Sequence, residues 1–260
     1  NISSPTQISG TSWCRVQATS NQSSLFAIRS DNTLWSWGEN SIGNLAQSDL
    51  VDRSSPTQIP GTTWCDIRSY ASHVLAVQSD NTLWAWGNNT NGHLGQSDRV
   101  HRSSPVQIPG TTWRKVAVGC CFSLGLKTDN TLWSWGTNTD GQLGVNDRVH
   151  RSSPVQIPGT TWCKVAGAER AIAALKTDGT LWTWGANFAG QLGVNNRANK
   201  SSPTQVPGTT WCNVDMGPDR MIAQRTDNSL WMAGTNVNID DLSLDRRSSP
   251  VQLPGSNWIN

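Results

Sequence analysis

Leu181-Trp182-Thr183-Trp184-Gly185 is one of five copies of a Leu-Trp-x-Trp-Gly motif, the last of which is divergent. The copies recur every 49 residues, and their first tryptophans are Trp35, Trp84, Trp133, Trp182 and Trp231. A second motif, Ser-Ser-Pro-x-Gln followed by Gly-x-x-Trp, occurs six times, with prolines at Pro5, Pro56, Pro105, Pro154, Pro203 and Pro250. Such self-similarity at a fixed period identifies a repeat array. We therefore predict a single domain over residues 1–260, made of five repeats of about 49 residues with an extra half-module shared by the two ends.

The residues around the first motif predict a β-hairpin in every repeat. Residues 173–177 and 180–184 flank Asp178-Gly179, and Asp-Gly between apolar runs is a strong signal for a two-residue hairpin loop. Both residues of the loop are expected to adopt the left-handed conformation of a type I′ turn, which Asn and Asp also tolerate. The other repeats carry Asp-Asn at this place, at Asp31-Asn32, Asp80-Asn81, Asp129-Asn130 and Asp227-Asn228. Because side chains alternate along a strand, Trp182 and Trp184 share one face of the hairpin.

The rest of each repeat predicts two further strands. Asn187-x-x-Gly190-Gln191-Leu192-Gly193 supplies glycines for turns after the hairpin. Pro203 cannot donate a hydrogen bond to a sheet, so residues 202–206 fit an edge strand, and Pro207-Gly208 turns the chain toward Trp211. No segment combines a helical period with adequate length. The predicted fold class is therefore all-β, a β-propeller of five four-stranded blades whose tryptophans form the core.

The stretch from Trp162 to Gly193 resembles the repeat of the regulator of chromosome condensation 1 (RCC1) family. It contains Trp-x-x-Val-Ala, then Ala-Leu-Lys-Thr-Asp-Gly-Thr-Leu-Trp-x-Trp-Gly-x-Asn-x-x-Gly-Gln-Leu-Gly, and the resemblance extends over essentially the whole chain. Members of that family are usually seven-bladed propellers, which implies that these five motifs either close as a smaller ring or belong to a larger one. In a closed five-bladed ring we expect the first and last modules to join in one sheet, which would hide both edges.

The terminal repeats depart from this pattern. Gly43-Asn44-Leu45-Ala46 replaces Gly-Gln-Leu-Gly in the first repeat, and Met232-Ala233-Gly234 replaces the second tryptophan in the last. Residues 238–242 have also lost the Gly-Gln-Leu-Gly tetrad. Terminal repeats of arrays are often atypical because they cap the structure. These two repeats are therefore interpreted as the true ends of the array.

The composition argues against two classes of partner. Charged residues make up 15% of the chain and the net charge is +2, which provides no cluster of Lys and Arg to neutralise phosphates, so we predict no nucleic-acid partner. No apolar run approaches the roughly 18 residues of a membrane-spanning helix, and no signal-peptide pattern follows Asn1. Membrane insertion is therefore not predicted.

No constellation of residues predicts catalysis, a cofactor or a metal site. The four histidines are scattered and are interpreted as solvated loop residues: His73, His93, His101 and His150. The aspartates fall in turns and form no acid–base pair, and no Cys-x-x-Cys pair exists for zinc. We predict that the protein is not an enzyme and that it needs no cofactor or metal.

The cysteines fall into two groups. Four of them directly follow the tryptophan of Gly-x-x-Trp: Cys14, Cys65, Cys163 and Cys212. Equivalent positions in different blades are too far apart to form disulfides, so buried free thiols are predicted. Cys120-Cys121 has no counterpart in the other repeats, and its disulfide state is left open.

The segment ahead of each hairpin varies most between repeats, and it is the predicted site of function. In a propeller these inter-strand loops gather at one end of the ring, where aromatic, sulfur and charged side chains suit a partner-binding surface. The predicted partner-binding residues are Tyr70, His73, Cys121, Phe122, Glu169, Arg170, Asp219 and Arg220.

The predicted function is a non-enzymatic binding or scaffold module that presents these loops to a protein or glycan partner. The middle repeats are nearly identical, as in residues 102–110 and their copy from Arg151. This indicates recent duplication, which favours a structural protein of a cell or virion surface over a cytoplasmic one. The family resemblance implies an alternative, nucleotide exchange on a small GTPase, although the hairpin insertion that RCC1 uses has no equivalent longer than two residues here. The oligomeric state is left open.

Overall fold

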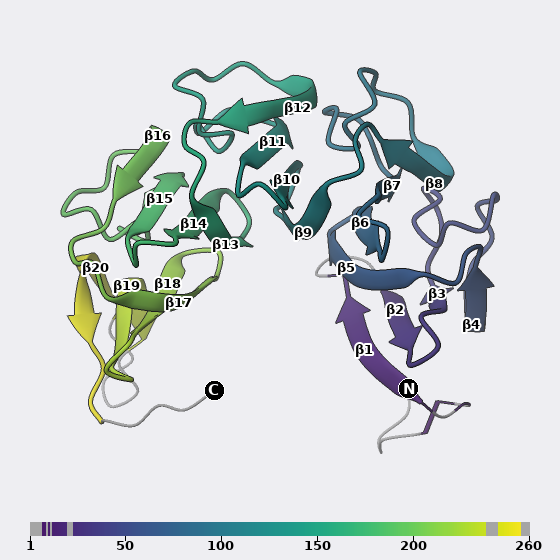
Figure 1. Cartoon of the computed structure of the whole chain (residues 1–260), viewed down its shortest axis with the longest axis horizontal. Coiled ribbons are helices and arrows are strands. Elements are labelled where there is room, and N and C mark those ends of the chain that lie inside the picture. The colour runs from purple at the N-terminus through teal and green to yellow at the C-terminus, as the bar shows by residue number, and fades with distance from the viewer. Residues whose placement is uncertain (1–6, 9, 11, 20–22, 238–243, 256–260) are drawn as a thin grey trace.

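A computed structural model describes residues 7–8, 10, 12–19, 23–237 and 244–255. Among these residues the regular secondary structure consists of β-strands alone, and the strands form five four-stranded antiparallel sheets. The strand order within each sheet follows the chain, so each sheet is a simple meander. The predicted all-β propeller architecture with five four-stranded blades is therefore confirmed (Figure 1).

Each blade consists of an inner, a second, a third and an outer strand. The inner strands are β1 (Trp13–Ala18), β5 (Trp64–Tyr70), β9 (Trp113–Val118), β13 (Trp162–Gly167) and β17 (Trp211–Met216). The second strands are β2 (Ser24–Arg29), β6 (His73–Gln78), β10 (Phe122–Lys127), β14 (Ala171–Lys176) and β18 (Arg220–Arg225). The third strands carry the Leu-Trp-x-Trp-Gly motif and are β3 (Leu34–Gly38), β7 (Leu83–Gly87), β11 (Leu132–Gly136), β15 (Leu181–Gly185) and β19 (Leu230–Val237). The outer strands are β4 (Arg53–Ile59), β8 (Arg102–Ile108), β12 (Arg151–Ile157), β16 (Lys200–Gln205) and β20 (Leu244–Gln252).

The five blades lie side by side along an open arc. The inner strands line its concave side and the outer strands its convex side (Figure 1). β1 pairs only within the first sheet and β20 only within the last. The sheet that a closed five-bladed ring would form from its first and last modules is thus absent among the described strands. The start of the first half-module, residues 1–6, lies outside the described residues.

The hairpin between the second and third strands differs from the prediction. In the first blade Arg29 O accepts a hydrogen bond from Asn32 N at 2.9 Å, and Arg29 N donates to Thr33 O at 3.0 Å. Only Asn32 of the loop has a positive φ, at 62°, so the loop has three residues and ends in one left-handed residue. Asp31 instead accepts hydrogen bonds from the Thr33 amide and hydroxyl at 3.0 and 2.6 Å, which lower the pKa of its carboxyl. The prediction of a two-residue type I′ turn is therefore wrong, because this side-chain bond favours a different backbone conformation at the aspartate.

Two sets of tryptophans pack the blades. The Gly-x-x-Trp tryptophans of blades 2 to 5 and the second tryptophans of the third strands of blades 2 to 4 are all buried. The ring of Trp184 lies 5.9 Å from that of Trp162 in its own blade. Its Nε1 donates to the carbonyl oxygen of Gln142 in the preceding blade at 3.0 Å. The Gly-Gln-Leu-Gly loop of one blade therefore packs against the second tryptophan of Leu-Trp-x-Trp-Gly in the next blade. This contact explains why these two motifs recur together.

The first tryptophan of each third strand is only half-buried, and in blades 1, 3, 4 and 5 a cationic side chain covers its ring. In the fourth blade Lys176 Nζ lies 4.2 Å from the Trp182 ring centroid and 4.9 Å from that of Trp162. Arg29, Lys127 and Arg225 occupy the same place in blades 1, 3 and 5. Cation–π attraction and the covering side chain thus let an edge tryptophan remain part of the packed blade.

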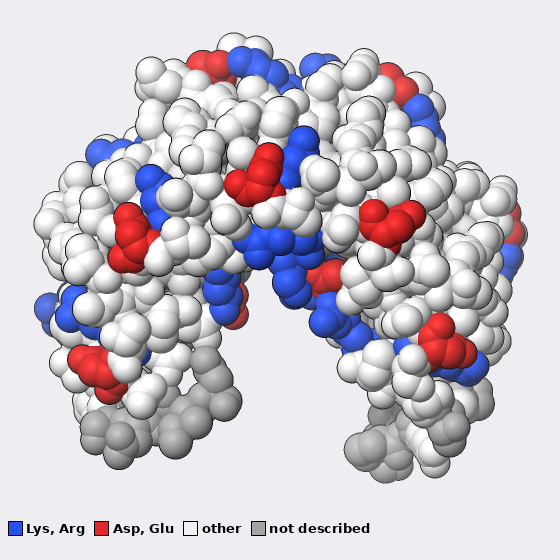
Figure 2. All heavy atoms as spheres, viewed as in Figure 1, with Lys and Arg blue, Asp and Glu red and all other residues white. Residues whose placement is uncertain are grey.

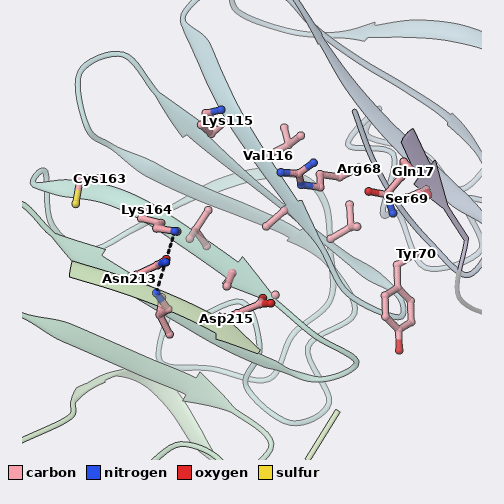
Figure 3. Close-up of a pocket in the computed structure, with 16 residues that line it drawn as sticks. Gln17, Arg68, Ser69, Tyr70, Lys115, Val116, Cys163, Lys164, Asn213 and Asp215 are labelled. Carbon is pink, nitrogen blue, oxygen red and sulfur yellow. Dashed lines mark hydrogen bonds between the residues drawn. The ribbon is translucent and has the colours of Figure 1, made fainter. Parts of the chain in front are cut away.

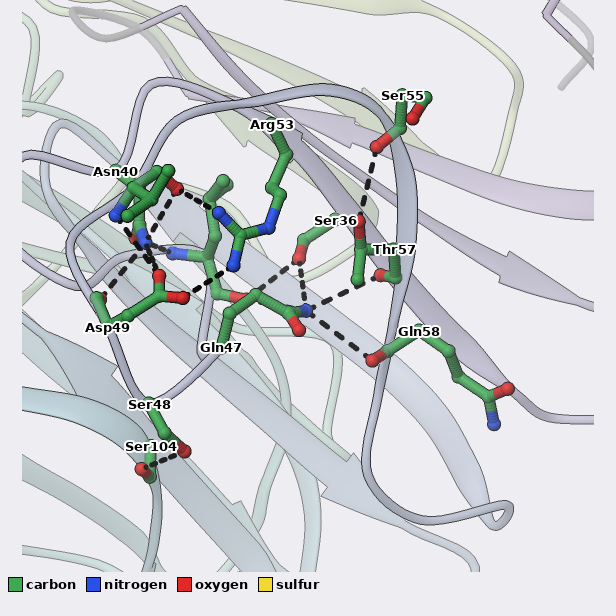
Figure 4. Close-up of polar contacts among 12 residues, drawn as sticks. Ser36, Asn40, Gln47, Ser48, Asp49, Arg53, Ser55, Thr57, Gln58 and Ser104 are labelled. Carbon is green, nitrogen blue, oxygen red and sulfur yellow. Dashed lines mark hydrogen bonds and ion pairs between the residues drawn. The ribbon is translucent and has the colours of Figure 1, made fainter.

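In blades 2 to 5 the Ser-Ser-Pro motif joins the outer strand to the loop of the preceding blade. In blades 1 and 2, Ser48 N donates to Ser103 O at 2.8 Å and the hydroxyls of Ser48 and Ser104 lie 2.9 Å apart (Figure 4). The loop is held internally by Asn40, whose side chain donates to Asp49 at 3.0 Å. Asp49 in turn pairs with Arg53 at 2.5 Å. Polar contacts on the convex side thus complement the tryptophans between the blades.

Candidate protein-binding surfaces

The inner strands border a groove on the concave side of the arc. It has a volume of about 940 Å³ and is lined by residues from β1, β5, β9, β13 and β17 (Figure 3). Small side chains contribute to the lining at Ala117, Ala166 and Gly167, and Tyr70 adds an aromatic ring. Each inner strand pairs with the second strand of its own blade only. Its other edge therefore keeps backbone groups that are not engaged in a sheet.

Basic side chains gather in this groove. Lys115 and Lys164 are exposed and occupy equivalent positions, two residues after the tryptophan of Gly-x-x-Trp, and Arg68 joins them on β5. Figure 2 shows Lys and Arg side chains clustered along the concave edge at the middle of the arc. Lys164 donates a hydrogen bond to the side chain of Asn213. Lys115 has no hydrogen bond or ion pair to any described residue.

Acidic residues of the inner strands compensate only part of this positive charge. Asp66 is almost fully buried and pairs with Arg15 of the first blade and, at 3.3 Å, with Arg68. Two arginines thus share one carboxylate. The one acid in the lining of the groove, Asp215, is exposed on the inner strand of the last blade. The excess positive charge therefore lies on blades 2 to 4, where the walls of a cleft strengthen its field.

The low overall charge of the chain concealed this cluster. The prediction of no Lys and Arg cluster able to neutralise many phosphates did not foresee this smaller one, because the fold brings the same position of successive repeats together along the inner surface. That position is Arg15, Lys115 and Lys164 in three of the five repeats. A comparison of repeats by position, in place of net charge, would have revealed the groove.

The predicted partner-binding residues lie in or directly beside the turns between the inner and second strands. We call these turns the rim loops, and they are Ala71-Ser72, Cys120-Cys121, Glu169-Arg170 and Pro218-Asp219. Glu169, Arg170, Asp219 and Arg220 have side chains between 43% and 54% exposed. Arg170 lies 3.6 Å from Asp140 of the preceding blade, and Arg220 lies 3.6 Å from Asp219. Tyr70 and Cys121 are half-buried. Because the inner strands run from the groove into the rim loops, these surfaces adjoin.

Two predicted residues are not available to a partner. His73 and Phe122 are the first residues of β6 and β10 and are 0% exposed. Each pairs with the glycine that ends the third strand of its blade, Gly87 or Gly136. Both side chains are therefore part of the packed interior, and the variable segment contributes to blade packing as well as to the surface.

A buried histidine pair lies at the seam between the second and third blades. The ring centroids of His73 and His93 are 4.5 Å apart, and His73 Nε2 lies 3.2 Å from the Ser123 hydroxyl. That hydroxyl donates its proton to His93 O at 2.7 Å, so His73 Nε2 is the donor in its contact with Ser123. Burial lowers the pKa of His73 well below its ordinary value and that of His93 to about 4. The prediction of solvated loop histidines is therefore wrong for these two.

His101 and His150 are exposed, in agreement with the prediction for loop histidines. Each nevertheless has a structural contact. His101 Nδ1 accepts a hydrogen bond from Asn89 N at 2.9 Å, and His150 Nδ1 accepts one from Asn138 N at 2.8 Å. In the fourth blade Asn199 Oδ1 takes this place and accepts from Asn187 N at 2.9 Å.

The cysteines that follow the Gly-x-x-Trp tryptophans are free but not buried. Cys14, Cys65 and Cys212 are exposed and Cys163 is half-buried, so the prediction of buried thiols is wrong. The register shifts between Trp64 and Asp66, which places Cys65 in a β-bulge. A bulge turns the extra residue away from the regular inward alternation. Its thiol donates to Val77 O at 3.4 Å, and partial burial raises its pKa.

The described residues contain no group of three or more His, Cys, Asp and Glu side chains placed to hold a metal ion. They also contain no helix with the length and hydrophobicity needed to cross a membrane.

Comparison with known proteins identifies the repeat. The model of the Regulator of chromosome condensation (RCC1) repeat matches residues 80–126, 129–175 and 178–217, and a second RCC1 repeat model matches residues 64–92 and 113–142. No curated protein sequence matches.

Several solved structures share the fold. Human WBSCR16 is 18% identical with a TM-score of 0.80, over 92% of this chain and 66% of that one. Yeast RCC1 (Prp20) bound to Kap60 is 20% identical with a TM-score of 0.75, over 90% and 62%. Prp20p from Saccharomyces cerevisiae, described with its binding properties to Gsp1p and histones, is 21% identical with a TM-score of 0.76, over 90% and 64%. The chain thus spans less than two thirds of the length of these proteins, and with the repeat matches it belongs to the family of RCC1 repeat proteins.

Proposed function

We propose that the protein is a non-enzymatic protein-binding module that takes up an acidic, extended segment of its partner in the concave groove. The observation that carries this proposal is the gathering of Arg68, Lys115 and Lys164 along a groove of about 940 Å³. The solved complex of yeast RCC1 with Kap60 supports protein binding as a use of this fold. The adjoining rim loops, with Glu169, Arg170, Asp219 and Arg220, would contact the part of the partner that leaves the groove.

The shape and chemistry of the groove favour a peptide over a nucleic acid. The free edges of the inner strands can exchange hydrogen bonds with an extended backbone, and Ala117, Ala166 and Gly167 leave room beside them. Single-stranded nucleic acids are held by aromatic platforms as well as by cations. Tyr70 is the one aromatic residue in the lining, and the cations are few.

Reversal of one groove charge tests the proposal. We expect a fluorescein-labelled oligoglutamate to bind the wild-type protein, and Lys115→Glu to weaken binding about 10-fold, which corresponds to about 1.4 kcal/mol. The expected cause is that Lys115 is exposed and has no competing ion pair in the described chain. Fluorescence anisotropy at several salt concentrations measures this, and binding should weaken as salt screens the charges.

A matched variant distinguishes the effect of a charge in the groove from the effect of the net charge of the protein. Arg148→Glu makes the same charge change at an exposed loop residue outside the groove lining and should leave the affinity unchanged. Labelled single-stranded DNA and oligolysine complete the comparison. Equal loss in both variants, or tighter binding of DNA than of oligoglutamate, would contradict an acidic peptide as the ligand.

Nucleotide exchange on a small GTPase is the second candidate function. It is favoured by the structural similarity to Prp20p, whose description names binding to Gsp1p. Release of a fluorescent guanine nucleotide from a small GTPase, measured with and without the purified protein, tests it. Acceleration of release would favour the exchange-factor function over the simple binding module. Glycan binding and a cell- or virion-surface location stay predictions from the sequence.

A further inference from the structure

Two adjacent thiols lie close together on the rim of the third blade. Cys120 and Cys121 are the two central residues of the tight turn closed by Gly119 N and Phe122 O at 3.0 Å. Successive side chains point to opposite faces in a strand. In this turn the two Sγ atoms are instead 3.3 Å apart. Both residues are half-buried and unbridged, so reagents can reach the pair.

The turn is held in place at both cysteines. Cys120 N donates to Glu169 O of the next blade at 3.0 Å, and Cys121 O accepts from Thr137 N at 2.8 Å. These backbone bonds keep the two thiols together without requiring a bond between the sulfurs. The hydrogen bond from Cys121 also lowers the pKa of the Cys120 thiol to about 7, so part of the population carries a thiolate at neutral pH. The other rim loops carry no cysteine.

The separation of the sulfurs suits a particular class of ligand. With sulfur bonds of about 2.3 Å, as in zinc thiolates, two sulfurs 3.3 Å apart subtend roughly 90° at a shared atom. An angle of this size fits a pyramidal three-coordinate centre with a lone pair, such as trivalent arsenic. Tetrahedral zinc requires a wider angle and further protein ligands, and no group of three or more ligating side chains occurs in the described chain.

We propose that Cys120 and Cys121 form a chelating site for trivalent arsenicals. An organic arsenic oxide, R–As=O, would form one As–S bond with each thiol. The two thiol protons leave with the arsenic-bound oxygen as one molecule of water. No electrons are transferred, and arsenic stays trivalent. Chelation by two thiols on one turn strengthens binding over a single thiol, as the second bond forms within the molecule.

Phenylarsine oxide and intact-protein mass spectrometry test this site on the reduced full chain. The wild type should gain one phenylarsenic unit in place of two thiol hydrogens. Cys120→Ala and Cys121→Ser should each lower the affinity about 100-fold or more. Each variant introduces the residue that the second blade carries at the equivalent position, Ala71 or Ser72, and each change lies in a turn outside the strands, so both variants are expected to fold. A triple variant, Cys14→Ser, Cys65→Ser and Cys212→Ser, removes the exposed single thiols and should bind as the wild type does.

Release distinguishes chelation from attachment to one thiol. Dimercaptopropanol should remove the phenylarsenic unit from the wild type, whereas glutathione at the same thiol concentration should leave most of it bound. The proposal is overturned if either turn variant, shown to be folded by circular dichroism, retains wild-type affinity. It is equally overturned if glutathione releases the unit as completely as dimercaptopropanol does.

Discussion

Trp184→Ala is expected to lower the free energy of unfolding by about 3 to 5 kcal/mol. The side chain is 0% exposed, so its removal opens a cavity at the junction of the third and fourth blades. It also removes the Nε1 hydrogen bond and leaves Gln142 O of the preceding blade without this donor. Urea unfolding followed by circular dichroism measures the change. A loss below about 1 kcal/mol would contradict the role of this tryptophan in joining the blades.

Two further variants test whether the loss of stability in Trp184→Ala arises from the buried position of this side chain. Trp182 belongs to the same strand but is half-buried, so Trp182→Ala should lower the free energy of unfolding less, since water can occupy the space that the side chain leaves.

The fifth blade suggests a second substitution that would compensate for the loss of Trp184. There Met221 pairs with Ala233, at the place where the fourth blade pairs Ile172 with Trp184. Ile172→Met added to Trp184→Ala should therefore recover about 1 kcal/mol, because methionine fills irregular gaps.

The geometry of the fifth blade supports this compensation. A Cβ on Gly193 would lie 3.1 Å from the Met221 methyl carbon, whereas a Cβ on Gly144 would lie 2.8 Å from Trp184 Nε1. The methionine methyl thus occupies the place beside the loop glycine that the tryptophan ring fills in the preceding blade. The divergent last motif, interpreted from sequence as a terminal feature, is a repacked version of the same junction.

The stability of the protein is expected to fall as the pH decreases from about 6.5 to 4. His73 and His93 are buried as neutral side chains, and burial lowers the pKa of both in the folded state. In this range the unfolded chain binds protons that the folded chain does not. Each histidine that stays neutral then costs about 1.4 kcal/mol of stability per pH unit. The midpoint of urea unfolding, measured at intervals between pH 7 and 4, reports this slope.

The third blade provides a matched variant for the histidine pair. It carries Phe122 and Gln142 at the positions of His73 and His93, so the double substitution His73→Phe and His93→Gln should remove most of the slope. His101→Asn changes an exposed histidine to the residue that Asn199 provides in the fourth blade, and it should retain the slope. The turn aspartates, whose pKa values are lowered from 3.8 by their threonine or serine partners, lose their contribution only at still lower pH. An unchanged slope in the double variant would contradict the buried-pair account.

The blade architecture was predictable because its determinants are local and repeated. Five copies of the motif at a regular 49-residue spacing predicted five blades, and the alternation of side chains in Leu-Trp-x-Trp-Gly predicted that both tryptophans share one face. The hairpin loop type was missed because the aspartate side chain bonds to the following Thr33. The exposure of Cys65 was missed because a β-bulge has no distinct sequence signal in this repeat.

The candidate binding surfaces were only partly predictable, because they depend on contacts between blades. His73 meets Ser123 of the next blade, 50 residues away, and no local pattern indicates this burial. The groove forms where Arg68, Lys115 and Lys164 converge from three different repeats. The exposed charges of the rim loops were identified in advance, because sequence variation among repeats marks turns that face solvent.

Hydrogen exchange of the protein with and without the oligoglutamate tests the central claim most directly. We predict that bound peptide slows exchange in the inner strands of the middle blades, residues 64–70, 113–118 and 162–167. Exchange in the outer strands, residues 102–108 and 151–157, should not change. Protection confined to the outer strands or to the loop of residues 137–150, with the inner strands unaffected, would contradict binding in the concave groove.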